Sequence, residues 1–496
     1  MPQVHEFLNA QVAERPYAPA LSDSIGVSWS FAELNQAAEA AASMLVEAGV
    51  RRNDRVLMLS ENCASVVAML FASWKIGAVI IPVNARQTAT EVQRIVTHAR
   101  PAAVVATTAA SADALTHAER LGARPVTGAF GTLHMAEGES NPDPDLDDVA
   151  VLLYTTGTTG DPKGVMLTHD NVRFGGKASA TLRDMTPDDV IYGVLPITHV
   201  FGLASVVTAA CYAGAQVRLE ARFSAAKLFA ALRDGATMLS AVPQMHALLM
   251  QYTREQGLTE LGSDRLRYVS SGAAPLDPAW KRKAEAFYGV ALQNGYGMTE
   301  TTAGVCATRN PIRSPDTSAG PALPGVEMKI DDTVPGGGNG EGEILTRGGH
   351  IMKGYYRNPE ETAKVLDADG WLRTGDLGMI DDEGRLHILG RSKELIIHGG
   401  FNVYPPEVEA ALNDHPQVVQ SAVIGRRWQG DEQVLAFVQV VPGARLTVDE
   451  LRSYAAERLA GYKRPARIVL AQELPAAPTG KILKHRLLEA FADQLD

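Results

Sequence analysis

A stretch rich in glycine and threonine, residues 154–164, has the composition of a phosphate-binding loop. It follows an apolar run at 149–153 and precedes a predicted helix that begins near Thr168. Glycines let backbone N–H groups approach an oxyanion, threonine hydroxyls add donors, and a lysine supplies positive charge. These properties favour a phosphate site over a flexible linker. Its candidate ligands are Thr155, Thr156, Gly157, Thr158, Thr159, Gly160 and Lys163.

The order of residues in this stretch differs from that of a P-loop. A P-loop that starts at Gly157 needs glycine where this chain has Pro162. It also needs Ser or Thr directly after the lysine, and here Gly164 follows Lys163. The sequence therefore disfavours a P-loop phosphotransferase.

Further short polar stretches follow predicted strands, where doubly wound sheets bind their ligands. Tyr296 offers an aromatic face for a base, Glu300 a carboxylate suited to Mg²⁺, and Asp376 an acid for ribose hydroxyls. Each residue alone also has a structural explanation, because Tyr296 can be a core residue and Asp376 a turn residue. Lys481, on a loop near the C-terminus, can be a solvated charge. The stretches are 270–275, 294–300, 371–376, 390–394 and 478–481.

Composition limits the class of protein. The chain has 496 residues, 46% hydrophobic and 21% charged, which allows a large core and more than one domain. Its net charge of -11 argues against non-specific nucleic-acid binding, which needs a basic face. Cys63, Cys211 and Cys306 lack metal-binding spacing and predict buried thiols in a reducing compartment. Residues 1–14 lack the pattern of a secretory signal, and no apolar window predicts a stable membrane span. We expect a cytoplasmic location.

The elements that must position these residues alternate between strand and helix. Ser30 and Glu33 form a predicted capping box, as do Thr88 and Glu91, and each opens a helix. Such alternation predicts parallel strands with helices on both faces of the sheet. The predicted strands of the first βα layer are 56–59, 78–81 and 103–106, with a helix at 64–75. Those of the second layer are 191–195, 237–242 and 266–270, with helices after Phe201 and Ser224.

The pattern changes beyond residue 325. Short alternating runs separated by glycine-rich turns predict a small antiparallel β unit up to Gly390, in which 377–380 pairs with 386–389. The last hundred or so residues predict a compact α+β tail, with strands at 418–424 and 434–441 and a helix opened by Thr447. The expected fold class is α/β: a large N-terminal region of doubly wound βα layers plus the β unit, then a smaller α+β domain. The expected domains are 1–390 and 391–496.

Five motifs in fixed order give the chain a close resemblance to a known family. They lie at 154–164, 296–300, 374–377, 390–402 and 478–481, so they extend over nearly the whole chain. In this order they resemble the adenylate-forming superfamily: acyl- and aryl-CoA synthetases, carrier-loading adenylation domains and insect luciferases. The resemblance implies an AMP-binding domain at 1–390 and a mobile C-terminal domain at 391–496.

The resemblance also implies a reaction in two steps. A carboxylate attacks the α-phosphorus of ATP and expels pyrophosphate, and the thiol of coenzyme A then displaces AMP. Lys481 would bridge the carboxylate and the α-phosphate, where two anions meet and a cation is needed. Glu300 would hold Mg²⁺ with Thr155 close by, while the loop grips the β- and γ-phosphates. The residues implied around the adenosine are Gly272, Ala273, Ala274, Asn294, Gly295, Tyr296, Gly297, Met298, Thr299, Asp376 and Arg391.

Residues 196–202 match the acyl-pocket motif of the family, in which His199 or the aromatic residue near it gates the carboxylate. The residues implied at this pocket are His199, Val200, Phe201, Ser205, Gly272, Gly297, Ala303 and Gly304. No Arg or Lys is present there to pair with a second carboxylate. A monocarboxylic acid, aromatic or a medium- to long-chain fatty acid, is therefore favoured over malonate-like diacids.

For the second step the resemblance implies a rotation of the C-terminal domain about Lys393. The pantetheine arm of coenzyme A would then lie along His398, Gly399, Gly400 and Phe401. Alternatively, the two glycines end a strand. Ile397 and Asn402 depart from the Lys and Gln that coumarate-type ligases carry, which weakens an assignment to that subgroup.

Pro475 and the pair Gly480-Lys481 match a pattern at which related bacterial synthetases are acetylated, so a lysine acetyltransferase acting on Lys481 is an implied partner. A homodimer is a further implied partner. The sequence leaves two alternatives to an acid:CoA ligase: an adenylation enzyme that loads a carrier protein, and a non-catalytic nucleotide-binding regulator. Lys481, Glu300 and Asp376 together argue against the regulator, and pyrophosphate release on a panel of acids separates the two classes.

Overall fold

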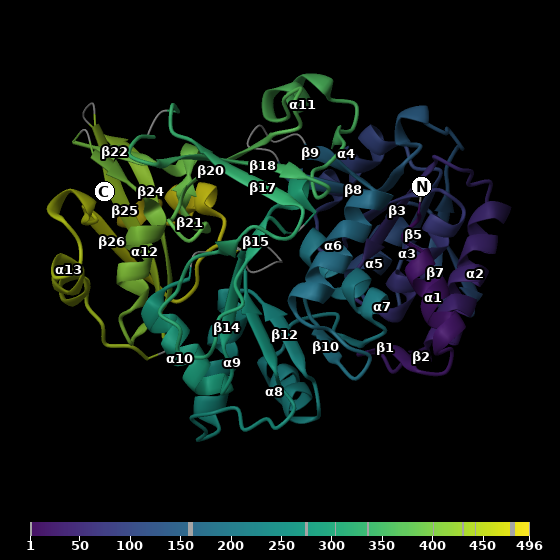
Figure 1. Cartoon of the computed structure of the whole chain (residues 1–496), viewed down its shortest axis with the longest axis horizontal. Coiled ribbons are helices and arrows are strands. Elements are labelled where there is room, and N and C mark those ends of the chain that lie inside the picture. Colours follow the sequence, from purple (N-terminus) through teal and green to yellow (C-terminus); the bar gives the residue numbers. More distant parts are fainter. Residues whose placement is uncertain are drawn as a thin grey trace.

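The computed structural model describes residues 2–156, 162–272, 276–302, 304–334, 337–399, 401–428, 431–441, 443–476 and 482–495. Figure 1 shows two sheets with helices packed around them in the N-terminal region, in purple to teal. A green antiparallel unit lies beside them, and the yellow C-terminal part lies at the opposite end from the N-terminus. The expected α/β class is confirmed. No described helix is both long and apolar enough to cross a membrane.

The first sheet has the predicted parallel centre. β3 (Arg55–Ser60) lies between β4 (Val79–Asn84) and β5 (Ala103–Ala106) and pairs with both in parallel. β8 continues the parallel order beside β4, whereas both edges of the sheet are antiparallel. The remaining strands are β6 (Arg124–Gly128), β7 (Gly131–Glu137), β8 (Val149–Thr156), β9 (Pro162–Thr168) and β19 (Gly354–Tyr355).

The second sheet also has a parallel centre. β10 (Val190–Gly193) pairs in parallel with β11 and β12, and the order continues through β13 to β14. β2 and β15 pair antiparallel at the two edges. The other strands of this sheet are β1 (Pro19–Asp23), β2 (Ser28–Ser30), β11 (Gln216–Leu219), β12 (Met238–Ala241), β13 (Tyr268–Ser271), β14 (Leu292–Tyr296) and β15 (Cys306–Ala307).

One hydrophobic core joins the two sheets. α3 (Ala64–Lys75) is buried from Ala64 to Trp74, and a helix that is apolar all round must be covered on every side. The hydrophobic core that covers α3 also contains Met58 of the first sheet and Val217 of the second. The other helices of this region are α1 (Glu6–Glu14), α2 (Phe31–Glu47), α4 (Ala89–Ala99), α5 (Ala112–Arg120), α6 (His169–Leu182), α7 (Ala209–Ala213), α8 (Ala225–Arg233), α9 (Pro243–Glu255), α10 (Pro278–Tyr288) and α11 (Pro359–Val365).

The predicted capping boxes are confirmed. Ser30 and Glu33 cap α2, and Thr88 and Glu91 cap α4, each through reciprocal side-chain and backbone hydrogen bonds. Two local predictions were incomplete. The phosphate stretch leads into a further strand, β9, before α6 begins after Thr168. The predicted helix after Phe201 begins as a π-helix, Phe201–Thr208.

The predicted antiparallel unit is confirmed as a separate sheet in the order β16-β21-β20-β18-β17. The predicted pairing of 377–380 with 386–389 is present, with Ile380 opposite Leu386. β21 continues to Arg391, which lies opposite Asp376. The strands are β16 (Gly320–Pro321), β17 (Val326–Asp331), β18 (Glu341–Gly348), β20 (Leu372–Ile380) and β21 (Arg385–Arg391).

The C-terminal part, which follows β21, has its own core around a sheet in the order β24-β25-β26. Its contacts with the N-terminal region include a hydrogen bond from the Tyr404 hydroxyl to Glu341 at 3.1 Å, and the packing of α9 against β24 and of α12 against β21. The elements are β22 (Ile396–His398), β23 (Phe401–Val403), α12 (Pro405–Asn413), β24 (Val418–Trp428), β25 (Asp431–Val440), α13 (Val448–Ala456), β26 (Arg467–Ala471) and α14 (Leu487–Ala490).

Candidate active site

Tyr296, Asp376 and Arg391 form one hydrogen-bonded group. The Tyr296 hydroxyl at the end of β14 donates to Asp376 Oδ2 on β20 at 2.6 Å. Arg391 Nε lies 3.2 Å from the other oxygen of the same carboxylate. Burial and the Asp376 charge raise the pKa of Tyr296 well above its usual value, so this hydroxyl stays protonated and donates. Tyr296, predicted to contact the base, and Asp376, predicted to bind the ribose hydroxyls, are therefore neighbours.

The position of Asp376 follows from the antiparallel unit. Its backbone N–H donates to Thr374 Oγ1 at 3.1 Å, and that hydroxyl donates to the Ile344 carbonyl of β18 at 2.8 Å. Since Asp376 lies opposite Arg391 in the ladder, the two side chains reach the same side of the sheet.

A second group connects Glu300 with the phosphate stretch. The Tyr355 hydroxyl donates to Glu300 Oε1 at 2.9 Å, and Lys163 Nζ lies 5.0 Å from the centre of the Tyr355 ring. Lys163 also forms an ion pair with Glu361 of α11. Burial raises the pKa of Glu300, and the Tyr355 hydrogen bond and the charges of Arg391 and Lys163 oppose that rise. Glu300 thus belongs to the second group and also feels the charge of Arg391 in the first.

The backbone of Glu300 is held by the segment that follows β18. Met352 N–H donates to the Glu300 carbonyl at 2.9 Å. Asn171, in the first turn of α6, donates to the carbonyls of Gly349 and Ile351 at 2.9 and 2.8 Å. The helix after the phosphate stretch therefore supports Glu300 indirectly.

The phosphate stretch connects β8 to β9 as a hairpin. Thr155 lies opposite Lys163 in the antiparallel ladder, so the predicted threonine and lysine are held side by side. Tyr356 N–H donates to the Gly164 carbonyl at 2.8 Å and ties the hairpin to β19. The predicted ligands Gly157, Thr158, Thr159 and Gly160 lie outside the described residues, and only the backbone of Thr156 is described.

The predicted acyl-pocket residues do not all have the same surroundings. A Cβ atom on Gly272 would lie 3.0 Å from Phe201 Cε1, so these two residues are in contact. His199 is exposed, and its Nδ1 accepts from the Phe201 N–H at 3.3 Å. Val200 is 1% exposed within the core, and the Ser205 hydroxyl accepts from Ser179 at 3.0 Å. Of the other three predicted members, Gly297 is exposed, Ala303 lies outside the described residues, and a Cβ atom on Gly304 would lie 2.9 Å from Leu323 Cδ1.

The predicted adenine-binding stretch runs from the end of β14 into a short 3₁₀ turn, Thr299–Thr301. Asn294 uses its side chain for the fold, since it donates to the Ser318 carbonyl at 3.0 Å. Gly297 is exposed, which leaves its backbone open to a ligand. Gly295, Met298 and Thr299 continue this chain segment, whereas Ala273 and Ala274 lie outside the described residues.

The predicted hinge and coenzyme A residues follow β21. Lys393 lies in the 3₁₀ turn Ser392–Glu394, and His398 ends β22. Gly399 has φ +58° in the turn to β23, so the hairpin itself explains this glycine. Phe401 is 57% exposed and stacks on Tyr462 at 4.6 Å between ring centroids. Gly400 and Lys481 lie outside the described residues, and the roles of all these residues stay predictions.

Comparison with known proteins identifies the family. Residues 8–356 match the AMP-binding enzyme family, and residues 407–481 match the AMP-binding enzyme C-terminal domain. The chain belongs to the AMP-binding enzyme family. It is 32% identical to 4-coumarate–CoA ligase 3 of Oryza sativa subsp. japonica, with 99% of this chain and 92% of the relative covered. Feruloyl-CoA synthase of Amycolatopsis sp is 34% identical, with 96% of each chain covered. Long-chain-fatty-acid–CoA ligase FadD13 of Mycobacterium tuberculosis (strain CDC 1551 / Oshkosh) is 32% identical, with 95% and 94% covered.

Solved structures agree with this membership. The enzyme superposes on ATP-bound MatB from Rhodopseudomonas palustris with a TM-score of 0.84 and 32% identity, and 99% of each chain is covered. It superposes on MenE from Bacillus subtilis in complex with ATP and a magnesium ion with a TM-score of 0.80 and 28% identity, and 97% of this chain and 98% of that chain are covered.

The described residues of this AMP-binding enzyme fit a phosphate-bound magnesium ion better than a protein-only metal site. Among them, no group of three or more His, Cys, Asp or Glu side chains could hold a metal. Mg²⁺ commonly takes one or two carboxylates and completes its shell with phosphate oxygens and water. Glu300, a single buried carboxylate near Lys163, suits that arrangement.

Two residues of the enzyme's candidate site were missed from sequence. Tyr355 and Glu361 lie in a segment that the sequence assigned only to the β unit, far along the chain from Lys163 and Glu300. No motif spacing marks them, because their contacts are made only by tertiary pairing. The sole local signal is the Asn358-Pro359 start of α11, which places Glu361 in the first turn.

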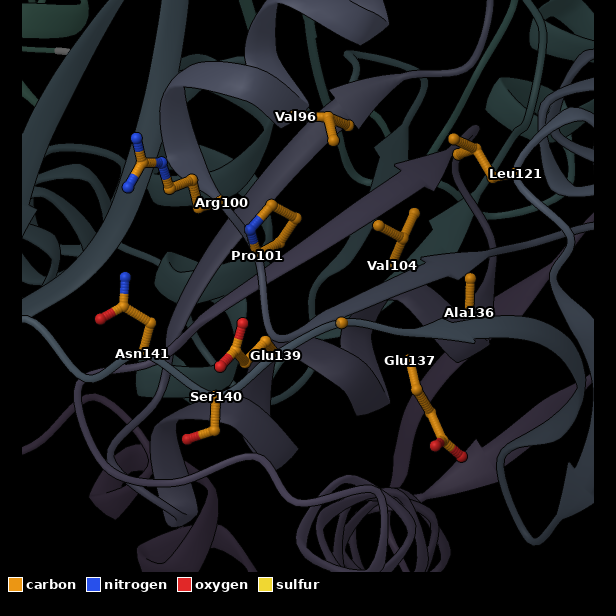
Figure 2. A pocket seen from close by; sticks show the side chains of 11 residues that line it. Val96, Arg100, Pro101, Val104, Leu121, Ala136, Glu137, Glu139, Ser140 and Asn141 are labelled. Carbon is orange, nitrogen blue, oxygen red and sulfur yellow. The ribbon is translucent and has the colours of Figure 1, made fainter.

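A separate cavity of about 560 Å³ lies at the antiparallel edge of the first sheet. Its lining includes the apolar side chains of Val96, Val104, Leu121 and Ala136 and the acids Glu137 and Glu139 (Figure 2). It contains none of the predicted site residues, so the candidate active site rests on the two hydrogen-bonded groups and the phosphate hairpin.

Proposed function

We propose that the enzyme is an ATP-dependent acid:CoA ligase that forms an acyl-adenylate and then an acyl-CoA thioester. One observation carries this proposal: two sites lie close together. Tyr296 with Asp376 suits a nucleoside, and Lys163 with Glu300 suits phosphates and their metal ion. A nucleoside triphosphate has both parts. The names of the relatives, which pair an acid with coenzyme A, support the same chemistry.

In the first step a carboxylate oxygen of the acid bonds to the α-phosphorus of ATP. The bond from that phosphorus to the bridging oxygen breaks, and pyrophosphate leaves with the electron pair. Asp376 and Arg391 would orient the ribose. Lys163 would offset the charge of the departing phosphates, and the Thr155 hydroxyl would donate a hydrogen bond to them. A magnesium ion held at Glu300 would stabilise the charge that develops on the phosphates.

In the second step the sulfur of coenzyme A attacks the acyl carbon. The bond from this carbon to the adenylate oxygen breaks, AMP leaves, and the thiol proton passes to solvent. We propose that the C-terminal part, from residue 391, rotates about Lys393 between the steps and brings His398, Gly399 and Phe401 to the thiol. The 52% exposure of Ile397 beside His398 supports a second arrangement that covers this face.

The proposed acid is a monocarboxylic aromatic or fatty acid. Phe201 and Gly272 offer an apolar contact where the motif predicts the pocket, and His199 lies beside Phe201. The relatives carry coumarate, ferulate and long-chain fatty acid in their names, which supports both acid classes.

The direct test is exchange of labelled pyrophosphate into ATP across benzoates, cinnamates and fatty acids of increasing length. We expect exchange that depends on the acid and on Mg²⁺ and needs no thiol. Product formation with coenzyme A, compared with a pantetheine-bearing carrier protein, then separates the ligase from a carrier-loading enzyme. Absence of acid-dependent exchange across the whole panel would refute the proposal.

Lys481 provides a test of the two half-reactions. Lys481→Ala should lower adenylation by orders of magnitude, because the cation between the two anions is lost. Thioester formation from a supplied acyl-adenylate should be retained. Equal loss in both half-reactions would refute the role of Lys481.

Two partners and the location remain part of the proposal. Acetylation of Lys481 would remove its charge and stop adenylation. Mass spectrometry after treatment with a lysine acetyltransferase, together with an exchange assay, tests this. A homodimer and a cytoplasmic location are tested by light scattering and by cell fractionation.

A further inference from the structure

Glu361 is held in place by the start of α11. Asn358 caps the helix by accepting the Glu361 N–H at 3.1 Å, and Thr362 Oγ1 accepts the Tyr355 N–H at 2.9 Å. The same Thr362 hydroxyl donates to the Asn358 carbonyl at 2.9 Å. The helix is thus fixed to β19, whose Tyr355 lies under Lys163.

The carboxylate of Glu361 binds two ammonium groups at once. One oxygen pairs with Lys163 of the phosphate hairpin, and the other pairs with Lys364 of the same helix. The side chains of Lys163 and Glu361 are 22% and 29% exposed, whereas Lys364 is 67% exposed. The pair with Lys163 is therefore the less screened of the two.

Lys163 cannot give its full charge to this carboxylate and to a nucleotide phosphate at the same time. If Lys163 turns to a phosphate, Lys364 stays on Glu361 and limits the cost of leaving that carboxylate partly buried. Lys364 can thus keep Glu361 paired with a cation when Lys163 leaves it.

We infer that Glu361 is a positioning residue that competes with the nucleotide for Lys163. It holds the lysine between turnovers, yields it to the β- and γ-phosphates of ATP, and takes it back as pyrophosphate leaves. This inference rests on the proposed function. It assigns to Glu361 and Lys364 opposite effects on the binding of triphosphate and pyrophosphate.

The test is calorimetric binding to the full chain of α,β-methylene-ATP with Mg²⁺, of pyrophosphate with Mg²⁺, and of AMP. Glu361→Gln should tighten the first two ligands about three- to fivefold, because the competing charge is lost. Lys364→Gln should weaken both about twofold, because Glu361 then holds Lys163 more firmly. AMP lacks the β- and γ-phosphates, so its affinity should stay the same in both variants. A merely structural role would change AMP binding as well.

Two further variants sharpen the comparison. Glu360→Gln is the matched control, because Glu360 is an exposed acid beside Glu361 in the first turn of α11. In a Lys163→Gln background, Glu361→Gln should have no effect on either phosphate ligand. Weaker or unchanged binding of the triphosphate to Glu361→Gln, with normal AMP binding, would overturn the inference alone. Failure of the unaltered chain to bind both AMP and the triphosphate would overturn the proposed function and the inference together.

Discussion

Tyr296 and Asp376 are joined by a hydrogen bond of 2.6 Å that connects the second sheet to the antiparallel unit. Tyr296 ends β14, and Asp376 lies in β20, which belongs to a separate sheet. The bond therefore fixes an aromatic face and a carboxylate relative to each other before any ligand arrives. Preorganised groups of this kind lower the reorganisation needed on binding.

Asp376→Asn removes the charge that Arg391 and the Tyr296 hydroxyl contact. We expect kcat/KM for ATP to fall about 10- to 100-fold, since hydrogen bonds to charged groups contribute about 1.5–3 kcal/mol. Pyrophosphate exchange at varied ATP measures this. Asp381→Asn is the control, because Asp381 pairs with Arg385 and His387 outside the candidate site. Equal losses in the two variants would indicate a general effect on the antiparallel unit.

Tyr355→Phe removes the donor to Glu300 and keeps the ring under Lys163. Burial already raises the pKa of Glu300, and loss of the Tyr355 hydrogen bond raises it further. The ionised carboxylate is the form that binds Mg²⁺, so activity is lost as pH falls through this pKa. We expect the acidic limb of the kcat/KM profile to move to higher pH and the Mg²⁺ requirement to rise. A profile that moves to lower pH would contradict this role.

Gly272→Ala adds a methyl group 3.0 Å from Phe201 Cε1. The ring must shift, so we expect kcat/KM for the preferred acid to fall about tenfold, a larger loss than for ATP, whose adenosine Gly272 is also predicted to border. Phe201→Ala should instead improve use of bulkier acids. Gly461→Ala is a suitable control, because a Cβ atom there would have nothing within 4 Å. An unchanged acid preference in both pocket variants would show that this contact does not border the acid.

Asn171→Ala removes the side-chain acceptor of the Thr168 N–H in the capping box of α6, and two hydrogen bonds to the segment that supports Glu300. We expect a local loss of about 2–4 kcal/mol, from about 1 for each of the three hydrogen bonds. Amide hydrogen exchange of residues 349–352 measures this local opening. Asp170→Asn, an exposed neighbour in the same turn, should leave that protection unchanged.

The sequence predicted elements whose signals are local. The capping boxes at Ser30 and Thr88 predicted the starts of α2 and α4, and the apolar run at 64–75 predicted both ends of α3. β9 was missed because the short apolar run 165–167 is consistent with either strand or helix and lies directly before a helix cap. The π-helical start at Phe201 was not predicted, because we know of no pattern in a single sequence that distinguishes a π-helix from an α-helix.

For the site, motif order indicated Tyr296, Glu300, Asp376 and Lys163 but not their contacts. Glu361 and Tyr355 reach Lys163 and Glu300 from a distant segment through β19, which has only two residues. Long-range pairing of this kind leaves no periodicity in the chain. The surroundings of Asn294 were also unexpected, since its amide supports the backbone near Ser318.

The central claim is that the oxygen of the acid becomes bonded to the α-phosphorus of ATP. An acid labelled with ¹⁸O in its carboxylate, chosen from the exchange panel, tests this in a single complete turnover with coenzyme A. Mass spectrometry of the recovered AMP should find one ¹⁸O atom, with none in pyrophosphate. Unlabelled AMP, or label released in inorganic phosphate together with ADP, would contradict the claim.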